Sequence, residues 1–304
     1  MIHQRWKQLR FRPVLLVPAL ARIICCGLLT AGLPAFSQES RENADYKMAV
    51  GLYSDGMYDL AVEQLKNFVS AYPTTSQSIE ARFSLGLAQM KLKRYEEARF
   101  TFQNFALTYP EHPNAPEAWL NVGDAYAALK NNREAASAYE RVKIFHPKSA
   151  LVPDALLKAA ELYRFLGERE SAKKLLRTIV QDYPSSKGIF AARLAVGDIY
   201  SEEGNTDLAE REALRLSQSD APAAVKAAAL LSLGRLQLRD RLFDHAESTF
   251  RSIVSSYKTM PSSPAATLEL GILEAHNEQY SEALGHLKSV VQNDALDDSL
   301  RARA

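Results

Sequence analysis

The chain has 304 residues, of which 47% are hydrophobic and 24% charged, and its formal net charge is +1. This composition indicates a soluble folded protein of one or two domains. Residues 1–37 hold five basic residues and no acidic one, which leaves 32 basic and 36 acidic residues for the remainder. A mildly acidic remainder lacks the basic surface that nucleic acid requires, so we expect no nucleic-acid partner.

The N-terminus has the pattern of a secretory signal peptide over residues 1–37. Basic residues come first, an apolar run covers residues 23–33, and small residues precede a cleavage site after Ser37. Cleavage there predicts a periplasmic or secreted protein. The alternative is an uncleaved inner-membrane anchor over residues 14–36. That anchor would place Arg22 in its middle, at a cost of about 2.5–3.5 kcal/mol.

Both cysteines, Cys25 and Cys26, lie inside this N-terminal segment. The mature chain is therefore expected to have no thiol, no disulfide and no cysteine metal site. A lipoprotein anchor needs a small residue directly before its modified cysteine, whereas Ile24 precedes Cys25 here. We therefore expect no lipidation. Contact with a membrane is expected only through partners or through an uncleaved N-terminus.

A period of 37 residues organises the rest of the chain. Three series of residues recur at this interval, and we call each series a column. The first column is an alanine that recurs seven times. A small residue stands 12 positions before each of these alanines, and another alanine stands five positions before the small residue. The first of these columns consists of Ala61, Ala98, Ala135, Ala172, Ala209, Ala246 and Ala283. Apolar residues four and seven positions later mark one face of a helix. The pattern predicts antiparallel helix pairs whose small residues allow close approach.

Turn signals separate the predicted helices. Within a pair, the turns are marked by Gly56, Asn131-Asn132, Gly167 and Gly204. Between pairs, the second helix is expected to end at an aromatic residue followed by proline, because proline cannot continue a helix. These pairs are Tyr72-Pro73, Tyr109-Pro110, His146-Pro147 and Tyr183-Pro184.

This spacing resembles the tetratricopeptide repeat, with Gly86, Ala98 and Pro110 at the family's intervals. The usual period is 34 residues, and here three extra residues follow the proline. The longer variant is similar to bacterial envelope proteins, notably the Tol–Pal-associated cell-division coordinator and the outer-membrane assembly factor BamD. The resemblance covers about residues 42–304. It implies an all-α fold, a right-handed superhelix of about seven helix-turn-helix repeats.

The predicted organisation is a signal peptide over residues 1–37 and a solenoid over residues 38–304. The repeats are expected to start near residues 42, 79, 116, 153, 190, 227 and 264, with a partial eighth from residue 301. Repeat five is predicted to be the softest, because Ala213 stands where other repeats have a large residue and Asp220-Ala221 replaces the Tyr-Pro turn. The natural chain is expected to continue past residue 304, since four residues cannot sustain a helix. The alternative is that residues 294–304 form a frayed tail.

No catalytic motif is recognisable in the sequence. It contains no metalloprotease motif, no nucleophile elbow and no glycine-rich phosphate loop. His245 and His276 lie in successive repeats, but they lack carboxylate or cysteine partners at ligand spacing, so we expect a structural role. The sequence therefore predicts a protein that is not an enzyme and that needs no cofactor and no metal.

The resemblance implies a concave groove lined by the first helix of each repeat. Mapped onto this chain, groove positions carry apolar residues in the first two repeats, acidic residues in the middle and basic residues in repeat six. The candidate partner-binding residues are Tyr46, Tyr53, Phe83, Leu87, Met90, Asp124, Glu161, Asp198, Arg235 and Arg239. An exposed apolar patch is typical of an interface. Ordinary solvated helix surface is the alternative for each charge, and packing against a preceding segment is the alternative for the apolar end.

The resulting hypothesis is a non-catalytic scaffold of the bacterial cell envelope that binds other proteins or peptides in this groove. Two alternatives stay open. One is a chaperone-like carrier of exported polypeptides, and the other is an accessory subunit of a cell-wall or polysaccharide enzyme complex.

Overall fold

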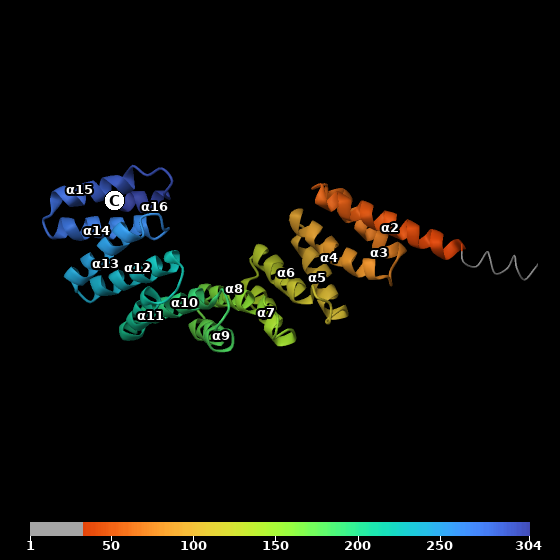
Figure 1. Cartoon of the computed structure of the whole chain (residues 1–304), viewed down its shortest axis with the longest axis horizontal. Coiled ribbons are helices and arrows are strands. Elements are labelled where there is room, and N and C mark those ends of the chain that lie inside the picture. Colours follow the sequence, from red (N-terminus) through yellow and green to blue (C-terminus); the bar gives the residue numbers. More distant parts are fainter. Residues whose placement is uncertain (1–32) are drawn as a thin grey trace, which may run out of the picture. The chain divides into compact units, whose positions relative to one another are not determined.

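The computed structural model describes residues 33–304, and every regular element in this part of the chain is an α-helix (Figure 1). The predictions for Cys25, Cys26 and most of the signal peptide lie outside the described residues. The all-α stack of helix pairs that the 37-residue period predicts is confirmed. By its contacts, the chain divides into two compact units, and the division falls between Lys93 and Arg94.

The first unit contains three described helices: α2 (Leu33–Ser54), α3 (Tyr58–Ala71) and α4 (Ser76–Lys91). The helix α2 begins before the predicted cleavage site after Ser37 and continues through it. Leu65 and Phe68 of α3 form the centre of the apolar core together with small residues such as Ala49 and Ala61. Thr75 caps α4, because its side chain accepts a hydrogen bond from the Ser78 backbone amide at 3.2 Å.

The second unit contains twelve helices, and each contacts the next one along the chain (Figure 1). They are α5 (Tyr95–Thr108), α6 (Ala115–Ala128), α7 (Asn132–Phe145), α8 (Val152–Phe165), α9 (Arg169–Asp182), α10 (Ile189–Glu202), α11 (Thr206–Gln218), α12 (Ala223–Arg239), α13 (Phe243–Ser256), α14 (Ser263–His276), α15 (Tyr280–Val291) and α16 (Asp298–Arg303). Odd-numbered helices from α3 to α15 are the second helices of the predicted pairs, and their first residues recur every 37 positions.

The turn inside each pair contains one residue in the left-handed region of the backbone. In three repeats this residue is Gly56, Gly167 or Gly204, with φ between 77° and 79°. The same position in the other four repeats is occupied by Lys93, Lys130, Arg241 and Glu278, with φ between 59° and 62°. The prediction that Asn131-Asn132 forms the turn was wrong by one residue, because Asn131 is the N-cap of α7 and Lys130 takes the left-handed conformation.

The small residues that recur every 37 positions lie where neighbouring helices pack closely, as the spacing predicts. All seven alanines of the Ala61 column are buried, with at most 3% of their surface exposed. In the second unit, a Cβ added to Gly234 would lie 2.5 Å from the Phe250 ring, so α12 and α13 can approach only because residue 234 lacks a side chain. The aromatic residue that precedes proline ends the second helix as expected, and the Tyr109 amide donates to the Phe105 carbonyl at 2.9 Å.

Repeat five departs from this pattern. Ala213 of α11 is buried where α7 and α13 place Tyr139 and Phe250. The following helix α12 begins at Ala223, three residues earlier than the period requires. At the other end of the chain, Asp297 caps α16 by accepting from the amides of Ser299 and Leu300. None of the described helices has the length and hydrophobicity needed to cross a membrane.

Candidate partner-binding surfaces

In the first unit, the predicted apolar residues of α2 pack against the unit's own core. Tyr46 lies with its ring centre 5.5 Å from that of Phe68, and Tyr53 lies 5.6 Å from Tyr58. Burial, helped by Glu80, raises the pKa of the Tyr46 hydroxyl. Both tyrosines are half-buried. Much of their surface therefore stabilises the fold and is not free for a partner.

The predicted partner-binding residues of α4 differ in how far they are exposed. Phe83 is buried, with 6% of its surface exposed, whereas Leu87 and Met90 are partly exposed. Leu87 and Met90 are therefore the members of the predicted apolar set in α4 that a partner can reach.

In the second unit, Asp124 of α6 is bound by residues from two neighbouring helices. Its Oδ1 accepts from the Tyr139 hydroxyl of α7 at 2.6 Å and from the Lys158 ammonium of α8 at 2.8 Å. Burial and this hydrogen bond raise the pKa of Tyr139 well above its usual range. The Asp124 carboxylate, which the sequence analysis proposed for partner binding, is thus already paired with Lys158 of the next repeat.

Asp198 of α10 lies two repeats after Asp124 and has the same kind of environment. The Ser232 hydroxyl of α12 donates to it at 3.2 Å, and Arg164 of α8 lies 3.8 Å away. Burial raises the pKa of Asp198, and the positive charge of Arg164 opposes this shift. Arg164 also donates to Glu202 at 2.9 Å, so it joins two turns of α10.

The predicted basic residues of α12 are likewise used inside the stack. Arg235 donates to Glu269 of α14 at 3.1 Å. Arg239 donates to the Ser201 carbonyl at 3.0 Å and to the Thr206 hydroxyl at 2.7 Å. Most of the predicted charge pattern along the first helices therefore consists of contacts between successive repeats.

These contacts share a spacing that the sequence analysis missed. The paired residues on successive first helices are separated by 34 or 38 positions, which is one period minus three or plus one. The pairs are Asp124–Lys158, Arg164–Asp198, Arg164–Glu202, Asp198–Ser232 and Arg235–Glu269. Opposite charges spaced 34 or 38 residues apart could have revealed these contacts in the sequence. Comparing only residues that are 37 positions apart does not detect them.

Glu161 differs from the other predicted charges. It is exposed on α8 and forms no hydrogen bond or ion pair within the described chain. Phe165 lies one turn further along the same helix, and 77% of its surface is exposed. Residues four apart lie on the same helix face, so Glu161 and Phe165 form one surface spot, which we call the Glu161–Phe165 spot. Phe165 also lies on the first helix of its repeat, but the sequence analysis did not single it out.

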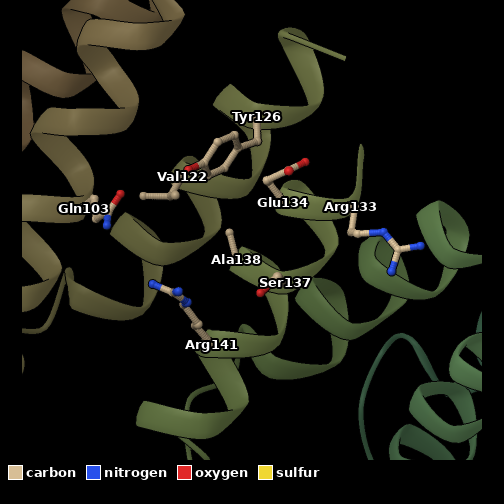
Figure 2. A pocket seen from close by; sticks show the side chains of 8 residues that line it. All are labelled: Gln103, Val122, Tyr126, Arg133, Glu134, Ser137, Ala138 and Arg141. Atoms are coloured by element: carbon tan, nitrogen blue, oxygen red, sulfur yellow. The ribbon is translucent and has the colours of Figure 1, made fainter. Parts of the chain in front are cut away.

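A hollow of about 290 Å³ lies between α5, α6 and α7 (Figure 2). Its lining residues are Gln103, Val122, Tyr126, Arg133, Glu134, Ser137, Ala138 and Arg141. Arg141 stacks over the Trp119 ring at 4.8 Å and Arg99 stacks over Tyr126 at 5.3 Å, so neighbouring cations and rings hold one another. Arg133 points away from the hollow in Figure 2 and forms an ion pair with Glu168.

Two histidines near the C-terminal end of the second unit contact neighbouring side chains. Among residues 33–304, no group of three or more histidine, cysteine, aspartate or glutamate side chains is arranged to hold a metal ion. His276 stacks on Phe243 at 5.5 Å, and His286 lies 2.7 Å from the buried carboxylate of Glu274. Both histidines are thus engaged within the helix stack.

Two protein-family models match parts of the chain. The model of the YfiO outer membrane lipoprotein family matches residues 38–196, more than half of the chain. The chain belongs to the YfiO family. A tetratricopeptide-repeat model matches residues 231–298. No curated protein sequence matches the chain.

Solved structures with the same fold span most of the chain. A tetratricopeptide repeat protein from Parabacteroides merdae is 16% identical, with 86% of this chain and 98% of that chain covered, at a TM-score of 0.53. The C-terminal part of a repeat protein from Cytophaga hutchinsonii is 12% identical, with 85% and 98% covered, at 0.60. PilW, a type IV pilus biogenesis factor, is 17% identical, with 75% and 99% covered, at 0.54. At these identities the likeness shows the fold alone.

Proposed function

We propose that this YfiO-family chain is a non-catalytic scaffold of the bacterial envelope that binds other proteins through the first helices of its repeats. The Glu161–Phe165 spot carries the proposal. It presents a large apolar ring and an unpaired carboxylate from a first helix, whereas the neighbouring charges are occupied by contacts between repeats. Exposed aromatic residues are typical anchors of protein interfaces. Leu87 and Met90 offer a second accessible apolar surface in the first unit.

The test is a pull-down from envelope extract with residues 38–304 as bait. A fixed set of partners at constant ratio is expected, and Phe165→Asp is expected to lose part of that set. Phe100→Asp is the matched control, because Phe100 is 61% exposed but lies on the second helix α5. A broad mixture of unfolded polypeptides would favour the carrier alternative. Co-purification of a single wall or polysaccharide enzyme would favour the accessory-subunit alternative.

The proposed location is the periplasm, with a mature chain that begins at Gln38. The signal pattern of residues 1–37 supports this, and the family match begins at residue 38. The family's description as lipoproteins raises the question of a lipid on Cys25 or Cys26. Intact-mass analysis of the protein from cells separates the two cases. A mass that begins at Gln38 agrees with the proposal, and a diacylglyceryl group on either cysteine would overturn it.

A further inference from the structure

An open groove of about 720 Å³ lies between two successive inter-repeat loops of the second unit. One wall is the loop that precedes α8, and the other is the loop that precedes α10. The Tyr183 hydroxyl donates to the Pro147 carbonyl at 2.8 Å and ties the two loops together. This volume lies in the range of sites that hold small ligands or a few peptide side chains.

The floor of the groove is apolar, and it exists because residue 188 is glycine. Leu151, Pro153, Leu157 and Pro184 contribute to the lining. A Cβ added to Gly188 would lie 2.9 Å from Leu157 Cδ1, so any side chain at this position would enter the space. One period earlier, the same column is occupied by Leu151. The groove is thus a local feature of this pair of repeats.

The rim of the groove carries an excess of one positive charge. Lys148 and Lys187 are both exposed and form no ion pair within the described residues. Of the two carboxylates in the lining, Asp182 is paired with Lys143 at 3.0 Å, which leaves only Asp154 to balance two lysines. An acidic group is therefore better accommodated here than a basic one.

A buried hydroxyl in the groove also lacks a partner. In the preceding loop, Ser149 Oγ accepts from the Leu151 amide at 3.2 Å. Its counterpart one period later, Ser186, makes no such bond, and its Oγ is buried without a hydrogen-bond partner in the described chain. Buried hydroxyls are nearly always satisfied in folded proteins. Because this oxygen has almost no accessible surface, the Ser186 side chain must rotate toward the groove before it can donate to a carboxylate of a bound segment.

We infer that the groove binds an extended peptide segment of a partner protein in which an acidic residue adjoins large apolar residues. The apolar side chains cover Leu157 and Pro184, and the acidic side chain meets Ser186 and Lys187. This inference rests on the proposed function, because it names the chemistry of one partner segment. The groove is formed by inter-repeat loops and is a separate surface from the Glu161–Phe165 spot.

The test uses NMR titration of ¹⁵N-labelled residues 38–304 with three synthetic peptides. The first is acetyl-Gly-Asp-Leu-Phe-Gly-amide, the second has lysine in place of aspartate, and the third has two glycines in place of Leu-Phe. The first peptide is expected to shift the amides of Lys148, Ser186 and Lys187. The other two are expected to bind about tenfold more weakly or not at all, which corresponds to one lost charge or apolar contact.

Two variants locate the site. Gly188→Gln fills the groove with the side chain that occupies the equivalent column at Gln77, and Lys187→Glu reverses the rim charge. Each is expected to weaken binding of the first peptide about tenfold or more. Lys174→Glu is the control, since it makes the same charge change on the exposed face of α9 and should leave binding unchanged.

Equal binding of the aspartate and lysine peptides, shifts confined to other parts of the chain, or no binding at all would overturn the groove inference. Those results leave the proposed function standing if the envelope pull-down still yields a fixed set of partners. Loss of that set with Phe165→Asp but not with Gly188→Gln would likewise support the scaffold and assign no partner to the groove.

Discussion

The ring of Tyr139 occupies the space in which a side chain on Gly123 would lie, since a Cβ added to Gly123 would overlap the ring carbon Cε1. Tyr139 is 3% exposed and donates its hydroxyl to Asp124, so the ring cannot move aside without breaking that bond. We predict that Gly123→Ala lowers the free energy of unfolding by about 1–3 kcal/mol, as overpacking typically does. Urea denaturation followed by circular dichroism measures this loss.

Gly197 is the matched control in the same column. Its added Cβ would meet only Glu212 Cβ at 3.4 Å and the Ala209 carbonyl at 3.9 Å, because Ala213 replaces the large residue of other repeats. Alanine is favoured over glycine inside a helix by about 0.5–1 kcal/mol. Gly197→Ala is therefore expected to leave the urea midpoint unchanged or raise it. A loss as large as that of Gly123→Ala would show that the two sites are not packed as described.

The left-handed turn residue offers a second pair of substitutions. Lys130 has φ of 62°, a conformation that costs a residue with a side chain about 1–2 kcal/mol and costs glycine little. Lys130→Gly is expected to stabilise the chain by about 1 kcal/mol, less the extra entropy of glycine in the unfolded state. Gly167→Ala makes the opposite change at the same repeat position and should destabilise. Shifts of equal sign in the two thermal melts would contradict the assigned turn.

We expect His146 to make the free energy of unfolding depend on pH. Burial lowers the pKa of its imidazole in the folded state, and nearby Glu111 opposes this shift. The unfolded chain then binds a proton near the ordinary value of about 6.5 and the folded chain does not, so this contribution to stability is lost as the pH falls below that value. His146→Tyr restores the residue found at this position in neighbouring repeats. Denaturation midpoints at pH 7.5 and 5.5 should differ less for the variant, and an unchanged difference would rule out His146 as the cause.

Repeat five is expected to open most easily. α11 buries Ala209, Ala213 and Leu216, whereas α5 buries the large rings of Phe102 and Phe105. Local opening follows the amount of packed apolar surface, and a solenoid allows one repeat to open without the rest. Amide exchange should be faster over residues 205–222 than over residues 94–109. Equal or stronger protection of 205–222 would mean that Ala213 does not weaken this repeat.

The fold was predictable from the sequence because close helix packing demands small residues at fixed intervals. Gly123, Gly234 and the buried alanines show that demand directly in the structure. The partner surface was much less predictable. Asp124, Asp198 and Arg235 occupy groove positions, yet their partners lie 34 positions away on the next first helix, and only the stacking geometry brings these pairs together.

The burial of Phe83 could not be predicted from the sequence for a related reason. A column identifies the helix face on which a residue lies but not how closely the neighbouring helices cover it. Glu161 and Phe165 stay accessible because no side chain of the described chain pairs with them, and a search by charge alone could find the first but not the second. The proposed binding surface thus depends on which groove residues the stack leaves free.

Photo-crosslinking in living cells tests most directly whether partners bind this first-helix surface. Benzoylphenylalanine replaces Phe165 in one strain and Phe100 in another, so that the same probe stands on an exposed position of a first and a second helix. We predict one or a few adducts of defined mass from position 165 and far weaker ones from position 100. Adducts only from position 100, or none from position 165 in cells that express the folded protein, would contradict the proposed role of the first helices.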